Sequence, residues 1–309
     1  MYSAIISAGL PKKTMSKKLV SSRFSLSTLY RLLTAMAKLA TALDSLHRED
    51  PTFGCKTDPE TGQTVISGMG ELHLEVLQHK LIREKKVDVR VGKPRVAYRE
   101  AITKAAEGEG KFVHQSGGHG QFGHVVLAVE PLLAEDGHYE TAIAFDANVT
   151  PDKVPKEYIS SVEQGVREAI GSGMLAGYPV VGFAQRLAGG CFHSVDSSDL
   201  AFEQAATMAL EKAIREAGPV LLEPVMRVQA VVPESGFGAV QADLLARRGL
   251  IRDCRVHGNM RIVDATVPLV ELFGYSSDIR SLTAGRGSFT MEPLSYERVP
   301  EQVAKAILF

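Results

Sequence analysis

One order of predicted elements occurs twice in this sequence: strand, helix, two strands, helix, strand. In the first third, apolar residues recur at spacings of three and four over 30–47 and again after Gly70, and both segments are predicted to be amphipathic helices. In the last third, helices are predicted over 238–246 and 273–282, with two strands between them. This order predicts an α+β fold class with two ferredoxin-like split βαβ modules, each a four-stranded antiparallel sheet with two helices on one face.

The two modules flank a different middle domain. The predicted segments are a divergent leader with a possible first strand (1–29), a first module (30–95), a middle domain with loops at 115–124 and 189–197 (96–218), and a last module (219–309). A length of 309 residues suits two or three domains.

The leader allows two interpretations. Residues 1–43 hold seven Lys or Arg and no Asp or Glu, and the serines between them are typical of an organellar targeting extension. The apolar run over 2–10, which ends at Pro11, equally predicts an edge strand, and this is the interpretation we prefer.

Composition excludes several classes of protein. Hydrophobic residues make up 45% and charged residues 23%, an ordinary globular balance. Three cysteines cannot form a fully paired disulfide framework, and no run of about 18 apolar residues occurs. We therefore expect a cytoplasmic protein without a membrane span. The middle domain carries nine basic and seventeen acidic side chains, which argues against a grip on the phosphate backbone by charge alone.

The segment 115–124 is polar and rich in glycine. Gly118, Gly120 and Gly123 match the spacing of a dinucleotide-binding loop, but that site requires a helix directly afterwards, and a strand is predicted from Val125. The segment also lacks the Lys and Ser or Thr of a Walker A loop. A loop between two strands can instead project outward and press its backbone against a partner, although a merely flexible hairpin remains an alternative.

His114, His119 and His124 recur every five residues, which raises the question of a zinc site. This spacing suits neither a helix face nor the usual ligand pairs with a fourth ligand nearby, so no metal is expected.

A second candidate segment contains Cys191 and His193, which an extended chain would place on one face as nucleophile and base. No orienting group or oxyanion hole is marked, which argues against a thiol enzyme. The residues that follow predict a helix over 200–217, capped by Ser197 or Ser198. This segment and the glycine-rich loop can lie together at one end of the middle domain.

Two arginines end the predicted helix over 238–246. Arg247 and Arg248, followed by Gly249, either complement the helix dipole before a glycine stop or contact phosphate. Arg280 and Arg286 allow the same alternatives, and such contacts would position an RNA without identifying its sequence.

The chain resembles the C-terminal half of translation elongation factor G, from its third to its fifth domain. The resemblance covers residues 30 to 300 and rests on these stretches: 49–53, 62–64, 66–75, 92–94, 96–100, 115–124, 154–158, 175–181, 193–198, 219–224, 247–249, 272–275 and 285–287.

The resemblance implies a ribosomal-protein-type α+β middle domain whose tip enters the decoding centre of the small ribosomal subunit during translocation. The residues it implies at the tip as RNA-contacting are Gln115, Ser116, Gly117, Gly118, His119, Gly120, Gln121, His193 and Asp196. It implies a last domain that faces large-subunit ribosomal RNA, with Arg247, Arg248 and Arg286 as its candidates. The implied partners are ribosomal RNA, transfer and messenger RNA, and ribosomal proteins.

The sequence also departs from that family. No GTPase domain and no catalytic residues are found, so no cofactor is expected on this chain, GTP and Mg²⁺ are expected only in a full-length member, and a separate GTPase domain is a further implied partner. The leader retains only a faint match. His119 replaces the arginine that is usual in the tip loop, which removes a permanent charge and makes tip contact sensitive to pH.

Three hypotheses follow. The first is a ribosome-binding part of an elongation factor G-like translocase that docks without turning over GTP. The second is a stand-alone structural or regulatory module that binds RNA or protein and no longer acts in translocation. The third is an enzyme that uses Cys191 and His193.

Overall fold

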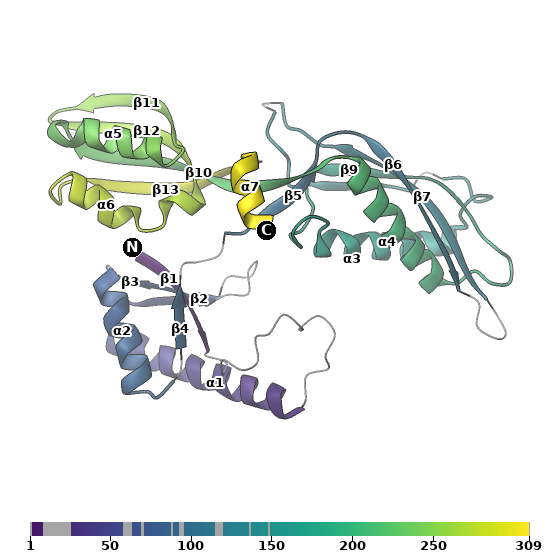
Figure 1. Ribbon diagram of the computed structural model, residues 1–309, viewed down its shortest axis with the longest axis horizontal. Helices are drawn as coiled ribbons and strands as arrows, with labels where there is room; N and C mark the ends of the chain where they lie inside the picture. The colour runs from purple at the N-terminus through teal and green to yellow at the C-terminus, as the bar shows by residue number, and fades with distance from the viewer. Residues whose placement is uncertain are drawn as a thin grey trace. The chain divides into compact units, whose positions relative to one another are not determined.

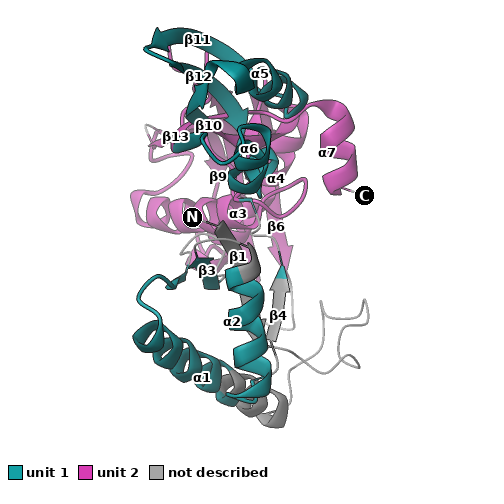
Figure 2. Ribbon diagram, turned by 90° about the vertical axis from the view of Figure 1, so that its left-hand side faces the viewer, with its two compact units in different colours: residues 1–96, 227–291 teal, residues 97–226, 292–309 magenta. Residues whose placement is uncertain are grey.

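The computed structural model describes residues 2–8, 26–57, 64–68, 71–87, 89–92, 96–114, 120–135, 137–147 and 149–308 (Figure 1). The chain forms two compact units, 1–96 with 227–291 and 97–226 with 292–309 (Figure 2).

The first module is a split βαβ fold. Its elements are β1 (Tyr2–Ala8), α1 (Leu26–Glu49), β2 (Gly54–Thr57), β3 (Thr64–Gly68), α2 (Glu71–Arg83) and β4 (Val89–Gly92). The strand order is β2-β3-β1-β4, and the pairs are antiparallel. The predicted fold class is confirmed for this module. Its core is formed by Leu39, Leu43 and Leu46 of α1, Leu74, Leu77 and Leu81 of α2, and Phe53 and Ile66.

Strand β1 corrects one prediction. The apolar run at the N-terminus is a strand, but it is central and not an edge, because it pairs with β3 on one side and β4 on the other. The strand ends at Ala8, before Pro11, so no proline removes a donor from either ladder. The proposed targeting segment after it lies outside the described residues.

The last module repeats this strand order. Its elements are β10 (Pro219–Pro233), α5 (Phe237–Ala246), β11 (Leu250–His257), β12 (Met260–Pro268), α6 (Tyr275–Leu282) and β13 (Ser288–Arg298). The order β11-β12-β10-β13 places the first strand inside the sheet, as in the first module. The first residues of β10 pair with β5 (Arg99–Ile102), and a final helix, α7 (Glu301–Leu308), follows β13. Neither β5 nor α7 was predicted.

The middle domain is a four-stranded sheet with helices packed on it. Its elements are β6 (Ala106–His114), β7 (Gln121–Pro131), β8 (Ile143–Asp146), α3 (Ile159–Ser172), β9 (Phe183–Cys191) and α4 (Asp199–Glu216). The strand order is β6-β7-β9-β8, in which only β8 and β9 are parallel. A 3₁₀ turn, Lys156–Tyr158, leads into α3.

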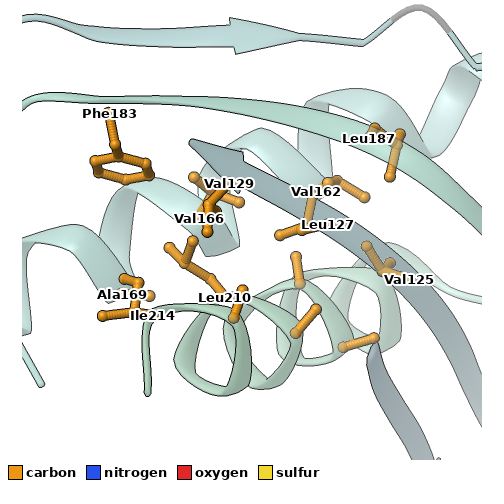
Figure 3. Close-up of a cluster of buried hydrophobic side chains, with 14 of the residues drawn as sticks. Val125, Leu127, Val129, Val162, Val166, Ala169, Phe183, Leu187, Leu210 and Ile214 are labelled. Carbon is orange, nitrogen blue, oxygen red and sulfur yellow. The ribbon is translucent and has the colours of Figure 1, made fainter. Parts of the chain in front are cut away.

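The core of this domain lies between β7 and the two helices. Val125, Leu127 and Val129 of β7 belong to one buried cluster with Leu210 and Ile214 of α4 (Figure 3). Burial of such side chains from water is the main stabilising contribution.

Helix α4 lies unusually close to β6 and β7 because glycines face it. A Cβ atom on Gly108, Gly110 or Gly123 would lie 2.1, 2.0 or 2.4 Å from a carbonyl oxygen of α4. The α4 residues at these contacts are alanines, Ala209, Ala205 and Ala201. Gly123, part of the apparent dinucleotide spacing, is therefore explained by helix packing.

Candidate nucleic-acid interface

Two segments that are distant in sequence meet at one end of the middle domain. The backbone N–H of Gly120 donates to Asp196 Oδ1 at 3.0 Å, and the N–H of Phe122 donates to the Asp196 carbonyl at 2.8 Å. The described residues 113–114, 120–122 and 192–197 are called the tip from here on. The expectation that the two loops lie together holds for these residues.

The hydroxyl of Ser197 joins the two loops of the tip by hydrogen bonds. It donates to the Phe122 carbonyl at 3.0 Å and accepts the N–H of His193 at 2.9 Å. The helix cap is the next residue, Ser198, whose side chain accepts the N–H of Ala201 at 3.3 Å. Of the two predicted caps, Ser198 is thus the correct one, which leaves Ser197 to join the two loops, a role that the sequence alone did not suggest.

His193 and Asp196 lie beside each other but differ in exposure. The side chain of His193 is 56% exposed and that of Asp196 is 34% exposed, with His193 Nδ1 and Asp196 Oδ2 3.2 Å apart. The same Nδ1 also lies 3.4 Å from the amide nitrogen of Val195 and 3.3 Å from that of Asp196. Asp196 therefore binds the backbone of the other loop, at Gly120, while the imidazole ring of His193 remains largely available to a partner.

Three apolar side chains of the tip are also exposed. Val113, Phe192 and Val195 are exposed by 61%, 41% and 62%. Aromatic and imidazole rings at such a loop can stack on unpaired bases, a contact that tolerates different base sequences.

The remaining predicted tip residues divide into two groups. Gln115, Ser116, Gly117, Gly118 and His119 lie outside the described residues. Gln121 is described and is half-buried as the first residue of β7.

The proposed histidine spacing does not bring a common site together in the described residues. His114 stacks on Phe112, and His124 contacts Glu109. Within the ranges that the structure describes, no group of three or more His, Cys, Asp or Glu side chains is arranged to hold a metal ion.

The nucleophile–base pair of Cys191 and His193, which the sequence analysis considered and argued against, is not formed. Cys191 Sγ lies 3.1 Å from Nδ1 of His124, while His193 pairs with Asp196. The rule that residues two apart share a face applies to an extended chain, and here β9 ends at Cys191 and a turn follows.

Arg247 has a structural role in the last module. Its guanidinium donates to Asp243 at 2.8 Å, to Asp278 at 2.6 Å and to the Glu271 carbonyl at 2.6 Å, and lies 5.0 Å from the ring centre of Tyr275. Burial alone would lower the pKa of Arg247, but the two carboxylates outweigh this and raise it above its ordinary value. Burial also raises the pKa of Tyr275. We call these five residues the Arg247 corner.

The neighbouring arginines differ from this. Arg248 Nε lies 3.1 Å from Glu271 Oε1, and Arg286 is exposed with one nitrogen 3.4 Å from Ser235 Oγ. The predicted glycine stop is wrong in detail, because Arg248 adopts the left-handed conformation, with φ 60°. Gly249 is required instead by close packing, since a Cβ there would lie 2.5 Å from the Leu244 carbonyl oxygen. Contact of these arginines with RNA stays a prediction.

Three family models match consecutive parts of the chain. They are described as Elongation Factor G domain III, over residues 30–93, Elongation factor G domain IV, over 94–218, and Elongation factor G C-terminus, over 220–307. The chain belongs to the elongation factor G family. The tip lies in the part that matches domain IV, and the Arg247 corner lies in the part that matches the C-terminus of elongation factor G.

A solved structure extends this result. A crystal structure of a protein from Thermus thermophilus is similar over 99% of this chain, with a TM-score of 0.79 and 37% sequence identity. This chain spans 42% of the length of that protein. In the described part of the chain, no helix has both the length and the hydropathy needed to cross a membrane.

Proposed function

We propose that this chain is the ribosome-binding part of an elongation factor G-type translocase. The tip of domain IV enters the decoding centre while transfer and messenger RNA move, and the protein acts in the cytoplasm. GTP hydrolysis, with its Mg²⁺, is assigned to a GTPase domain outside these 309 residues, so no cofactor is assigned to this chain.

The observation that carries the proposal is the construction of the tip. Asp196 and Ser197 hold two loops together through backbone contacts, and this leaves His193, Phe192 and Val195 exposed. A braced backbone lowers the entropy lost on docking, because the exposed groups are already held in place.

The charge of domain IV supports recognition by fit. An excess of acidic side chains repels phosphate, so binding through the tip should release few counterions and depend weakly on salt. If basic side chains of the last domain contact ribosomal RNA, they would make ribosome binding depend more steeply on salt concentration.

The test is co-sedimentation of the 309-residue chain with ribosomes at low salt. The triple variant Phe192→Ser, His193→Ala, Val195→Ser removes the exposed groups of the tip and should weaken binding by about tenfold or more, since each stacked or packed group contributes about 1 kcal/mol or more. Leu133→Ser is the matched control. Leu133 is 52% exposed and follows the opposite end of β7 from the tip, so its removal should change binding by less than about twofold.

The same experiment separates the alternative of a stand-alone module. Ribosome binding that survives both the triple variant and replacement of residues 115–121 by alanine and serine would support that alternative. Failure of the unaltered chain to bind ribosomes at low salt would contradict the proposed function itself.

A further inference from the structure

Three side chains form a hydrogen-bonded row on the sheet of domain IV. Cys191 Sγ lies 3.1 Å from His124 Nδ1, and His124 Nε2 lies 2.8 Å from Glu109 Oε1. Cys191 is exposed, while the side chain of His124 is 18% exposed. The sulfur of Cys191 is therefore accessible to solvent, whereas the imidazole of His124 that contacts it is mostly buried.

The sheet register places these side chains together. His124 of β7 lies directly opposite Cys191 of β9 and, on its other side, opposite Lys111 of β6. Glu109 is two residues from Lys111, so it shares the same sheet face and lies diagonal to His124. The neighbours of His124 along β7, Gly123 and Val125, face α4 and the core, so the row lies on the face of the sheet away from α4.

The carboxylate determines what the imidazole can do. Ionised Glu109 accepts hydrogen bonds only, so it favours the tautomer in which His124 Nε2 carries the proton. Nδ1 then carries a lone pair and points at the Cys191 thiol. A nucleophile, a base and a group that orients the base are the required parts of an activated thiol.

We propose that Cys191, His124 and Glu109 form a modification site for small hydroperoxides. Cys191 Sγ attacks one peroxide oxygen, a sulfur–oxygen bond forms and the oxygen–oxygen bond breaks. The thiol proton passes to His124 Nδ1 and then to the departing oxygen, which leaves as water when the oxidant is hydrogen peroxide. The sulfur is oxidised by two electrons to sulfenic acid, and the peroxide is reduced. Glu109 is a positioning residue that also stabilises the imidazolium while it exists.

The other cysteines of the chain provide comparisons. Cys55 is also exposed, but the atoms that cover part of it raise the pKa of its thiol, and no such row is formed around it in the described residues. The sulfur of Cys254 lies 4.0 Å from a guanidinium nitrogen of Arg261, so this thiol has a cation beside it. Cys55 is therefore the reference for an unassisted thiol.

The experiment measures oxidation of each cysteine in the full 309-residue chain. Hydrogen peroxide is added at neutral pH, dimedone traps sulfenic acid, and mass spectrometry follows the rate at each cysteine. Cys191 should react about tenfold or more faster than Cys55, because a positioned base contributes at least this much. His124→Gln should bring the Cys191 rate to within about threefold of the Cys55 rate.

Two further measurements exclude a merely structural effect. Glu109→Gln retains a hydrogen-bond acceptor but removes the charge, so the Cys191 rate should fall about threefold or more, whereas a purely structural role predicts no change. For His124→Ala, added imidazole should restore part of the rate, which unfolding of the domain would not allow. Equal rates at Cys191 and Cys55, or an unchanged Cys191 rate in His124→Gln, would overturn the proposal. An unchanged rate in Glu109→Gln would overturn the role given to Glu109.

Discussion

The tip of domain IV and the Arg247 corner use their polar side chains in opposite ways. In the tip, His193 is 56% exposed, and the contacts that hold the loops are made by Asp196 and Ser197 through backbone groups. In the corner, Arg247 is 17% exposed and its donors are taken by two carboxylates and a carbonyl. The tip stabilises its backbone and leaves side chains exposed, whereas in the Arg247 corner the side chain of Arg247 itself stabilises the structure.

This difference shows what residue type alone conveys about function. A histidine in a turn and an arginine at a helix end are both typical of RNA contacts. The neighbouring residues decide between a structural role and a free side chain. Asp243, one helical turn before Arg247, and Asp278 on α6 accept hydrogen bonds from its guanidinium. More than half of the His193 side chain, in contrast, is exposed to solvent. The comparison therefore predicts that changes in the corner affect stability and that changes at the exposed face of the tip do not.

The largest effect is expected for Arg247→Ala. This change leaves Asp243 and Asp278 without their shared cation and removes the guanidinium from the ring of Tyr275. Loss of one partner of a buried ion pair costs about 3 kcal/mol or more, but half of the Asp278 side chain is exposed, so the local free energy of opening of α5 and α6 should fall by about 2 to 3 kcal/mol. Hydrogen exchange of the amides in these helices measures it without assuming two-state unfolding of a multidomain chain.

Arg286→Ala is the matched control for that experiment. Arg286 is exposed in the same module, so its removal should change the protection of α5 and α6 by less than about 0.5 kcal/mol. Equal effects of the two variants would show that Arg247 contributes no more to the stability of α5 and α6 than the exposed Arg286 does.

A smaller effect is expected for Ser197→Ala. The variant loses the hydrogen bond to the Phe122 carbonyl and leaves the N–H of His193 without its acceptor, which should lower protection of residues 192–198 by about 1 to 2 kcal/mol. Ser194→Ala in the same turn is the control, because Ser194 is exposed, and a change below about 0.5 kcal/mol is expected there. A Ser197 variant with native protection would mean that the two loops associate without this hydroxyl.

The repeated split βαβ order could be predicted because it depends on local patterns. Spacings of three and four residues mark α1 and α2, and Gly258 marks the turn between β11 and β12, where its φ is 60°. The central position of β1 could not be predicted, because it is decided by pairing with strands far along the chain. Strand β9 was missed for a local reason, since its two adjacent glycines, Gly189 and Gly190, weaken the strand pattern.

The features of the site could likewise be predicted where they depend on local patterns and not where they depend on long-range pairing. The cap at Ser198 follows from residue type beside a predicted helix. The contact between His124 and Cys191 does not, because these residues are 67 positions apart and are brought together only by strand register.

Glu100 gives the clearest case of a contact without a sequence signal. It is fully buried, and its carboxylate accepts four backbone N–H groups at 2.6 to 3.2 Å. The donors belong to Met174, Leu175, Ala176 and Tyr178. A glutamate beside Ala101 and Ile102 in β5 shows only that some partner exists.

The third prediction concerns Asp196→Asn. Asparagine retains an oxygen that can accept the N–H of Gly120 but removes the charge beside His193. Because this pair is partly exposed, protection of residues 120–122 should fall by only about 0.5 kcal/mol, whereas Asp196→Ala should cost about 1 kcal/mol. A loss in the asparagine variant as large as in the alanine variant would show that the charge, and not the backbone contact, holds the loops.

The smallest effect on stability is expected for His193→Ala. The ring contributes only long contacts of 3.2 to 3.4 Å within the tip, and its backbone N–H still finds Ser197 Oγ in the variant. Protection of residues 192–198 should therefore change by less than about 0.5 kcal/mol, as for an ordinary exposed side chain. Hydrogen exchange of the free chain measures this, with Ser197→Ala as the positive control in the same segment. A loss above about 1 kcal/mol would place His193 with Arg247 as a bracing residue, and the contrast between the two regions would no longer hold.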